Sequence, residues 1–418
     1  MHLENIIIKT SALKFDRKLE GLRGICAFNV AIAHLYSFNF FNLKNYDFPR
    51  WLSVLDFAHA AVLMFFLLSG YVIGINHLDI PLSVKNLKTY LIKRLVRIYP
   101  IYLIALLLSI ACLYPYLNKS ELFGHFFFLQ GILLKSYSSN VVLWSLSYEV
   151  IYYLIFPILW LIHNRIRNYM FSLLAFTILA QFITKDPTLN AIITGAVFWQ
   201  AGLLISMLRS QQSPPEQPVI SYFLLLLAIT SLDTGRFIYD LIIKHLSTGE
   251  PQLAPNDLLF LPVCTLLFLS IIQQKIRFKN IIQWIAIIGP AFQIFLLYHF
   301  KHLENPKTGW LVGIVLFALS LATIAYKIDV RKFLKFEFAG KISYAVYLFH
   351  FPIAFYLSDM LSKYLSGFVL VFVGLTAWSC ITLVSAFLTE LKLQPRIKEY
   401  FLRKDSIAIT SSITKQTT

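Results

Sequence analysis

The chain has 418 residues, of which 58% are hydrophobic and 14% charged, and its mean hydropathy is +0.67. Soluble domains contain about 45–50% apolar and about 25% charged residues. The composition therefore excludes a soluble globular protein and predicts an all-α polytopic membrane protein. The net charge of +16 is typical of nucleic-acid binding, but the basic residues cluster between apolar runs. Basic loops mark the cytoplasmic face, so the charge indicates topology and no nucleic-acid partner is expected.

Apolar runs long enough to cross a membrane recur along the chain. Two shorter runs, 170–184 and 219–232, leave the expected number of spans at ten to twelve, and either even number places both termini in the cytoplasm. The ten predicted spans cover residues 21–41, 54–76, 97–117, 143–163, 189–209, 257–273, 281–300, 309–326, 342–362 and 367–389.

We expect a cytoplasmic N-terminal segment over 1–20, one membrane domain over 21–390 and a cytoplasmic tail over 391–418. Residues 118–140 are expected to be interfacial or a broken span, and residues 233–256 to form a long outward loop. All four cysteines fall inside apolar runs. They are expected to pack as small side chains, without forming disulfides.

Arg23 and His34 share the first apolar run and are eleven residues apart. Eleven residues make about three helical turns, or roughly 16 Å, so both side chains lie on one face. Arg23 can be a cytoplasmic anchor, and His34 a hydrogen-bonded polar residue between helices. Alternatively, His34 is a neutral imidazole deep in the membrane that acts as a general base. The pair alone leaves both interpretations open.

Two further motifs also have an ordinary explanation. The Ser69-Gly70-Tyr71 sequence lies in the second apolar run, where a glycine permits close helix packing. Arg94 and Arg97 are three residues apart and share a helix face. They can anchor the helix at the cytoplasmic surface or bind phosphates bidentately.

Two later runs carry polar groups into apolar segments. The run Trp144 to Glu149 opens a span, and Glu149 lies about five residues inside it. One interpretation is a serine that caps the helix N-terminus, with Glu149 at the membrane interface. The other places Glu149 in a polar cavity within the membrane. Ser343, Tyr347 and His350 are spaced by four and three residues. They therefore project from one helical face, and aromatic belts do not explain the deeper histidine.

The order of these motifs resembles the acyltransferase-3 family of polytopic membrane acyltransferases. The run Leu19 to Gly24 followed by His34 resembles the family's first-helix signature, and Phe65 to Tyr71 its second-helix motif. The resemblance covers about residues 15–390, and the blocks 94–100, 144–149 and 343–352 follow in the family's order. Glu20 replaces an aspartate that is common there, and we expect no appended extracytoplasmic esterase-like domain.

The resemblance implies transfer of an acyl group, usually acetyl, from cytoplasmic acyl-CoA to a hydroxyl of a surface or lipid-linked polysaccharide. It implies His34 and Glu149 as catalytic residues, and Arg23, Arg94 and Arg97 as donor-binding residues. The expected residues of the acceptor cavity are Ser69, Tyr71, Trp144, Ser147, Tyr347 and His350. Acetyl-CoA is the expected donor substrate, with no tightly bound cofactor and no metal site.

The implied partners are membrane lipids, acyl-CoA and a carbohydrate acceptor, and the implied location is a bacterial cytoplasmic membrane. A transporter or flippase for a glycan or polar lipid is the alternative, because intramembrane ionisable residues also build proton relays. Many transporters show paired interrupted spans in corresponding halves. The sequence has no such internal symmetry.

Overall fold

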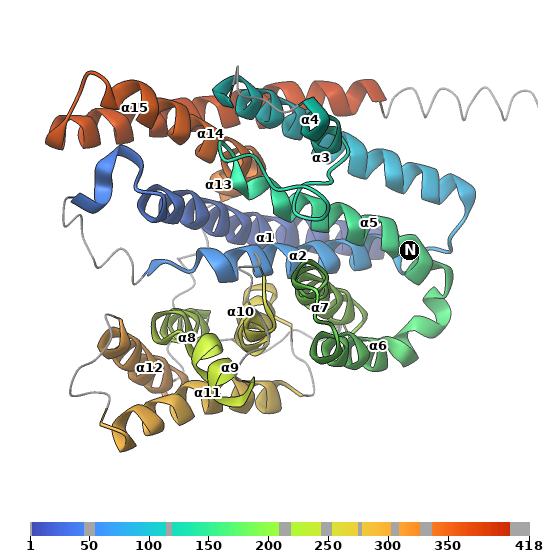
Figure 1. Cartoon of the computed structure of the whole chain (residues 1–418). Helices are drawn as coiled ribbons and strands as arrows, with labels where there is room; N and C mark the ends of the chain where they lie inside the picture. The colour runs from blue at the N-terminus through green and yellow to red at the C-terminus, as the bar shows by residue number, and fades with distance from the viewer. Residues whose placement is uncertain are drawn as a thin grey trace, which may run out of the picture. The chain divides into compact units, whose positions relative to one another are not determined.

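A computed structural model describes residues 2–45, 55–113, 119–208, 219–243, 253–274, 278–301, 309–326 and 337–401 (Figure 1). The described chain is built of helices, and an isolated bridge joins Gln130 to Leu134. The α-helices are α1 His2–Ser37, α2 Ala58–His77, α3 Val84–Leu113, α4 Lys119–Phe126, α5 Trp144–Leu161, α6 His163–Ile183, α7 Pro187–Met207, α8 Val219–Leu232, α9 Thr234–Ile243, α10 Phe260–Ile272, α11 Lys279–His299, α12 Trp310–Ala325, α13 Glu337–Lys341, α14 Ser343–Ser362 and α15 Gly367–Phe387. The 3₁₀-helices are η1 Phe40–Asn45, η3 Val141–Leu143 and η4 Pro255–Leu259, and a π-helix, η7, covers Leu388–Leu393.

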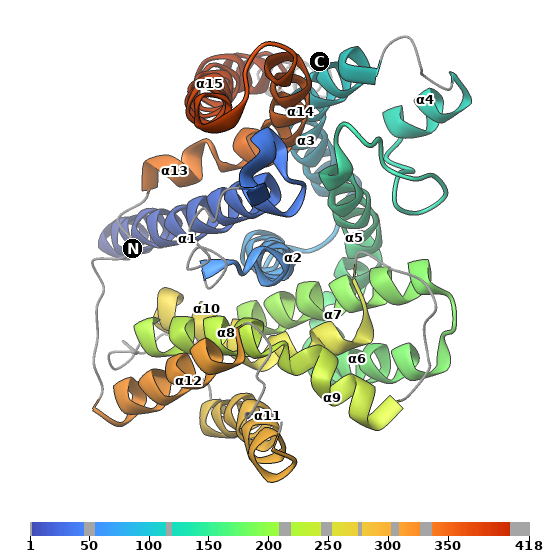
Figure 2. The same cartoon turned by 60° about the vertical axis from the view of Figure 1, so that its left-hand side comes forward.

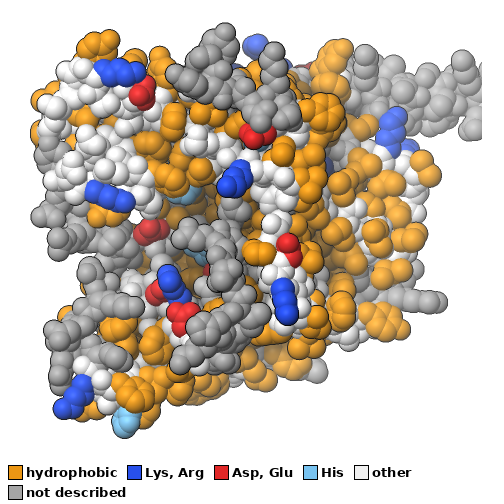
Figure 3. Space-filling model, viewed as in Figure 1, with side chains coloured by type: hydrophobic (Ala, Val, Ile, Leu, Met, Phe, Trp, Pro, Cys, Tyr) orange, Lys and Arg blue, Asp and Glu red, His pale blue; other side chains and the backbone are white. Residues whose placement is uncertain are grey.

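The predicted all-α class is confirmed, and each predicted span overlaps a helix. The two shorter runs correspond to α6 and α8. Among the described residues, seven helices are long and apolar enough to cross a membrane, or eight if the bent pair α8 and α9 forms one span. Large apolar side chains are exposed on many of these helices (Figure 3), as expected for surfaces that face lipid. The number ten and the cytoplasmic termini stay predictions.

The chain divides into two compact units that are interleaved in sequence. The first comprises Met1–Ala33, Asp47–Ile80 and Ile162–Gly340. The second comprises His34–Tyr46, Pro81–Leu161 and Lys341–Thr418. Helix α1 runs without a break from His2 across the predicted boundary at residue 20, and the predicted domain boundaries stay predictions.

Glycines bring α2 and α7 together in the first unit. A Cβ atom on Gly70 would overlap the backbone carbonyl of Trp199, and one on Gly202 would overlap that of Leu67. The two helices pack against each other (Figure 1), and the bare backbone permits this close approach. The ordinary explanation for Gly70 is therefore confirmed.

The expected loop over 233–256 is wrong in its first part. Residues Thr234–Ile243 form α9, which is bent by 52° from α8. Asp233 occupies the break with a φ of 52°, a left-handed conformation that aspartate tolerates better than most residues. Apolar residues recur along α9 with helical spacing, and the expectation overlooked that pattern because of the flanking glycines and prolines. Residues 118–140 contain only the eight-residue α4 and irregular segments within their described part, too short to cross a membrane.

In the second unit, α14 packs against both α3 and α15 (Figure 2). Helices α3, α5 and α14 each contain an internal proline, at Pro100, Pro157 and Pro352. A proline has no N–H, so the carbonyl four residues before it loses its helical donor. A side chain from another segment donates in each case, as expected for prolines in membrane helices. These hydrogen bonds are Gln394 Nε2 to Val96 O at 2.6 Å, Tyr90 OH to Tyr153 O at 3.1 Å, and Asn140 Nδ2 to Leu348 O at 3.1 Å.

Candidate active site: a pair of histidines

Two of the predicted site residues lie in direct contact in the second unit. His34, near the end of α1, and His350, in the middle of α14, are joined by a hydrogen bond of 2.9 Å between His34 Nδ1 and His350 Nε2. Their ring planes are inclined by only 20°. His350 is buried, whereas His34 is half-buried. The sequence predicted both histidines as site residues, but it did not predict that they touch.

The hydrogen bonds of His350 determine which nitrogen of His34 carries the proton. His350 Nδ1 lies 3.1 Å from the carbonyl oxygen of Val346, which can only accept, so Nδ1 carries the hydrogen. The Nε2 atom of a neutral His350 is then an acceptor. His34 must donate to it through Nδ1–H. The remaining ring nitrogen, His34 Nε2, therefore carries a lone pair.

Aromatic side chains surround this pair. Phe38 and Phe351 each meet the His34 ring edge-on, with centroids 5.6 and 5.7 Å away. Trp378 of α15 donates its indole N–H to the carbonyl oxygen of His350 at 2.9 Å. The backbone carbonyl and both ring nitrogens of His350 are thus hydrogen-bonded, whereas the Nε2 atom of His34 is not engaged by His350.

The turn after α1 holds His34 against α14 and α15. In η1, Phe41 is fully buried and its backbone N–H donates to Ser358 Oγ of α14 at 3.0 Å. Phe41 has a φ of 58°, a left-handed conformation that costs a bulky residue of order 1–3 kcal/mol. The buried ring and the serine contact offset that cost.

The predicted donor-binding residue Arg23 lies in the first unit and already has a partner. Its Nη1 atom lies 2.6 Å from Glu20 Oε1, one turn earlier on α1. The side chains are 14% and 25% exposed, so the pair is partly shielded from water. Glu20 itself packs closely, because a Cβ atom on Gly340 would overlap its backbone carbonyl. The charge of Arg23 is therefore balanced within its own helix.

Arg94 lies between two tyrosine rings in the second unit. Its Cζ atom is 5.5 Å from the ring centroid of Tyr90 and 5.4 Å from that of Tyr153. The Tyr153 hydroxyl donates to Glu149 Oε1 in a short hydrogen bond. Glu149 thus contacts the ring that flanks Arg94, and its predicted catalytic role stays a prediction. Arg97 is exposed.

The predicted cavity residues of α5 and α14 have different environments. Tyr347 OH lies 2.8 Å from Ser145 Oγ, and Ser145 Oγ lies 3.1 Å from the carbonyl of Val142. Trp144 is half-buried, and its ring lies edge-on to Tyr148. Ser147 is buried, and its hydroxyl has no hydrogen-bond partner among the described residues.

Ser69 and Tyr71 belong to the first unit and are both buried. Tyr71 packs edge-on against Phe268 of α10, with centroids 5.1 Å apart. This environment is that of a helix-packing interface. Their assignment to an acceptor cavity stays a prediction.

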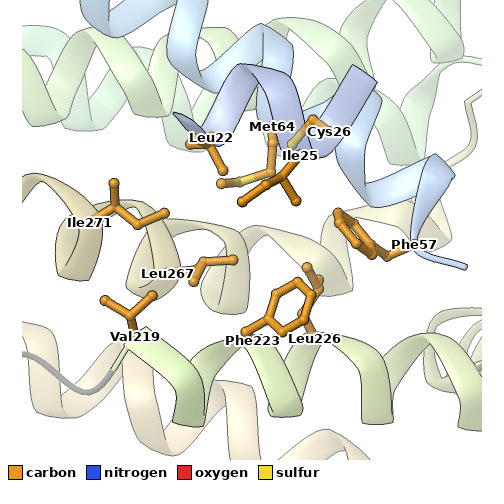
Figure 4. A pocket seen from close by; sticks show the side chains of 10 residues that line it. All are labelled: Leu22, Ile25, Cys26, Phe57, Met64, Val219, Phe223, Leu226, Leu267 and Ile271. Carbon is orange, nitrogen blue, oxygen red and sulfur yellow. The ribbon is translucent and has the colours of Figure 1, made fainter. Parts of the chain in front are cut away.

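A pocket in the first unit has a purely apolar lining (Figure 4). It lies between α1, α2, α8 and α10, and Cys26 contributes its thiol to the wall. Such a lining offers no donor or acceptor to a phosphate or a sugar, so the pocket does not suit either polar substrate. The lining residues are Leu22, Ile25, Cys26, Phe57, Met64, Val219, Phe223, Leu226, Leu267 and Ile271. All four cysteines are free, as expected.

Several residues around the site were not predicted. Tyr90 and Tyr153 each lie four residues from a predicted site residue, Arg94 and Glu149 respectively, and spacing of four on a helix is a readable signal. Asn140 was overlooked because it lies in an irregular segment. Trp378 lies in an apolar run with no local pattern that indicates a role.

Comparison with known proteins decides the family. The family model described as "Acyltransferase domain" of the acyltransferase-3 type matches residues 16–384. This chain belongs to the acyltransferase-3 family. A protein of Acidianus two-tailed virus that is named as an acetyltransferase is 30% identical over 178 residues. That alignment covers 42% of this chain and 49% of the viral protein, so the match spans about half of that relative. No solved structure matches the chain.

The acyltransferase-3 family match and the apolar helices are consistent with each other, because seven of the described helices are long and apolar enough to cross a membrane. The matched region contains both histidines, the arginine pair of α3 and Glu149. The resemblance in the sequence is therefore confirmed at the level of the family.

Proposed function

We propose that this acyltransferase transfers an acetyl group from cytoplasmic acetyl-CoA to a hydroxyl of a cell-surface or lipid-linked polysaccharide, with His34 as the base. The observation that carries the proposal is the hydrogen bond between His34 Nδ1 and His350 Nε2. It leaves the lone pair on His34 Nε2. Family membership supports acyl transfer, and the name of the viral relative supports acetyl as the group.

The chemistry follows from that lone pair. An alcohol is a poor nucleophile near neutral pH, so His34 Nε2 takes the hydroxyl proton as the oxygen attacks the thioester carbonyl. The carbon–sulfur bond then breaks, and the same nitrogen returns the proton to the departing thiolate of CoA. During the step His34 is positively charged, and His350 Nε2 remains an acceptor for its Nδ1–H. His350 is thus a positioning residue, comparable in role to the group that orients the histidine of a hydrolase triad.

Arg94 and Arg97 would bind the phosphates of CoA, since guanidinium groups bind phosphate oxygens bidentately. Arg97 is exposed and Arg94 is half-buried, so both can meet a charged ligand. Arg23 would contribute less, because its charge is already balanced by Glu20. A bacterial cytoplasmic membrane is the proposed location.

The test uses membranes that contain the protein, supplied with labelled acetyl-CoA, and measures label on extracted glycan. We expect His34→Ala to reduce transfer by about 10²–10⁴-fold, the usual contribution of a general base. The amount of protein in the membrane and its binding of CoA are measured in parallel and should be unchanged. Label transfer that persists in His34→Ala would refute the base, and translocation of glycan without transfer from any acyl-CoA would favour a transporter.

A further inference from the structure

Arg94 is held more tightly than a surface anchor requires. Tyr90 lies one turn before it on α3, and Tyr153 approaches from α5, so that its guanidinium carbon lies about equally far from both ring centroids. Both tyrosines are buried. An arginine between two aromatic rings gains cation–π attraction from each and loses freedom to move. An anion at this site would have to be bound by the N–H groups of the guanidinium.

One of those groups is Nε–H. The Nε atom of Arg94 is buried and has no hydrogen-bond partner among the described residues. A buried donor without a partner is costly, and Nε–H is one half of the fork that binds two oxygens of a phosphate side-on. The geometry therefore favours an anion with paired oxygens at this edge.

The two tyrosines are themselves anchored. The Tyr90 hydroxyl donates to Tyr153 O, the carbonyl that Pro157 leaves without a helical donor. The Tyr153 hydroxyl donates to Glu149. Tyr90 also packs against Phe156, with centroids 5.3 Å apart. Each ring beside Arg94 is thus fixed at its hydroxyl end.

We propose that Tyr90 and Tyr153 are positioning residues that hold Arg94 for the diphosphate of the acyl-CoA donor, and that Glu149 belongs to this donor site through Tyr153. The assignment rests on the proposed function, since it takes acyl-CoA as the donor. Under this proposal, Glu149 contributes to the binding of CoA and is not a catalytic residue. A change at Glu149 should therefore alter the KM for acetyl-CoA and leave kcat unchanged.

The experiment uses the full-length protein purified in detergent and measures CoA binding separately from acetyl transfer. Tyr153→Leu removes the ring, whereas Tyr153→Phe keeps the ring and removes the contact with Glu149. We expect Tyr153→Leu to raise the Kd for CoA and the KM for acetyl-CoA about tenfold, the scale of one desolvated cation–π contact. Tyr153→Phe and Glu149→Gln should each raise them about two- to threefold, the scale of one weakened hydrogen bond. All three should keep kcat within about twofold, because the acyl-transfer step is untouched.

A double-mutant cycle separates positioning from general packing. In an Arg94→Ala background, Tyr153→Leu should have no further effect on CoA binding, because the residue that it positions is gone. Tyr99→Leu is the matched control, since Tyr99 lies on the same helix and packs against Tyr102 and Phe128. It should leave the Kd for CoA unchanged.

The outcomes are distinct. Loss of kcat in Glu149→Gln at unchanged KM, or an undiminished effect of Tyr153→Leu in the Arg94→Ala background, overturns the assignment while acetyl transfer by the wild type stands. If the wild type neither binds CoA nor uses acetyl-CoA, the proposed donor is wrong and the assignment falls with it. If Tyr153→Leu does not fold, Tyr153→Phe and Glu149→Gln still decide the question.

Discussion

The side-chain amide of Asn140 donates to the carbonyl oxygen of Leu348 at 3.1 Å, in place of the backbone donor that Pro352 lacks. The same side chain donates to Ser109 Oγ at 3.0 Å. Asn140 therefore links the segment before α5 to both α3 and α14. Because His350 lies two residues before Pro352, this link supports the helix that carries one member of the histidine pair.

Asn140→Ala should destabilise the protein by about 1–3 kcal/mol, because it leaves a buried carbonyl without a donor. Pro352→Ala supplies a backbone N–H to that carbonyl, so the cost of Asn140→Ala should be smaller by about 1 kcal/mol in the Pro352→Ala background. Thermal unfolding of the four proteins in detergent measures the difference. Asn86→Ala is the control, since Asn86 is only half-buried and its amide donates to the carbonyl of Pro81 in an exposed hydrogen bond. Equal costs in both backgrounds would contradict the explanation.

His350→Leu should lower kcat about 10²-fold, on the order of one misoriented catalytic histidine, because it removes the acceptor that fixes the proton on His34 Nδ1. A glutamine can place an amide oxygen near the same point, so His350→Gln should retain most of the activity. The KM for acetyl-CoA should stay constant in both variants. Initial-rate kinetics with labelled acetyl-CoA measure these values, and equal losses in the two variants would speak against an acceptor role.

Gly70→Ala should destabilise the packing of α2 against α7 by about 1–3 kcal/mol, because the added methyl group overlaps the backbone of Trp199. Gly289→Ala is a matched control in another membrane helix, where the nearest atoms to a Cβ lie at 3.6 Å. That distance is ordinary contact, so the control should be neutral or slightly stabilising. Melting temperatures of the two variants provide the comparison. Similar losses in both variants would show that the effect does not arise from overlap at Gly70, because alanine is the better helix former.

Glu20→Gln should lower the KM for acetyl-CoA about two- to threefold, because it releases the positive charge of Arg23, and such part-exposed pairs contribute less than about 1 kcal/mol. Glu20→Asp keeps the charge and should behave as the wild type. Steady-state kinetics at low salt detect the change most clearly, since exposed charges are screened as salt increases. An unchanged KM in Glu20→Gln would remove Arg23 from the donor site.

The free energy of unfolding should decrease when the pH is lowered, because of His125. This residue lies in α4, outside the spanning helices. Burial lowers its pKa, and the carbonyl of Glu121 offsets part of that effect. The unfolded chain, with a pKa of about 6.5, then binds more protons than the native state, so stability decreases below about pH 6.5 until the native pKa is passed. His125→Phe keeps a ring stacked on Tyr137. The drop in melting temperature between about pH 7.5 and about pH 5 should be smaller in this variant, because it lacks the titrating group. An equal drop would exclude His125 as the source.

The lengths of the apolar runs predicted the helices well, since a segment that crosses a membrane must satisfy its backbone within a helix of about 20 residues. The spacing within one helix also predicted that Arg94 shares a face with Arg97. The contact of His34 with His350 could not be predicted from the sequence, because 316 residues separate the two histidines and no local rule specifies which helices meet. The expected loop over 233–256 failed for a different reason, since turn-forming residues at its ends concealed a short amphipathic helix.

The three proline positions have a consequence for biosynthesis. The donors that replace the missing backbone N–H groups lie 63, 208 and 298 residues from their acceptors. While the chain is being made, the Val96 carbonyl of α3 has no such donor until Gln394 has left the ribosome. The hydrogen bonding of helix α3 is thus completed only after 298 further residues have been translated. A stop codon shortly before position 394 would therefore remove a hydrogen-bond donor on which the third helix depends.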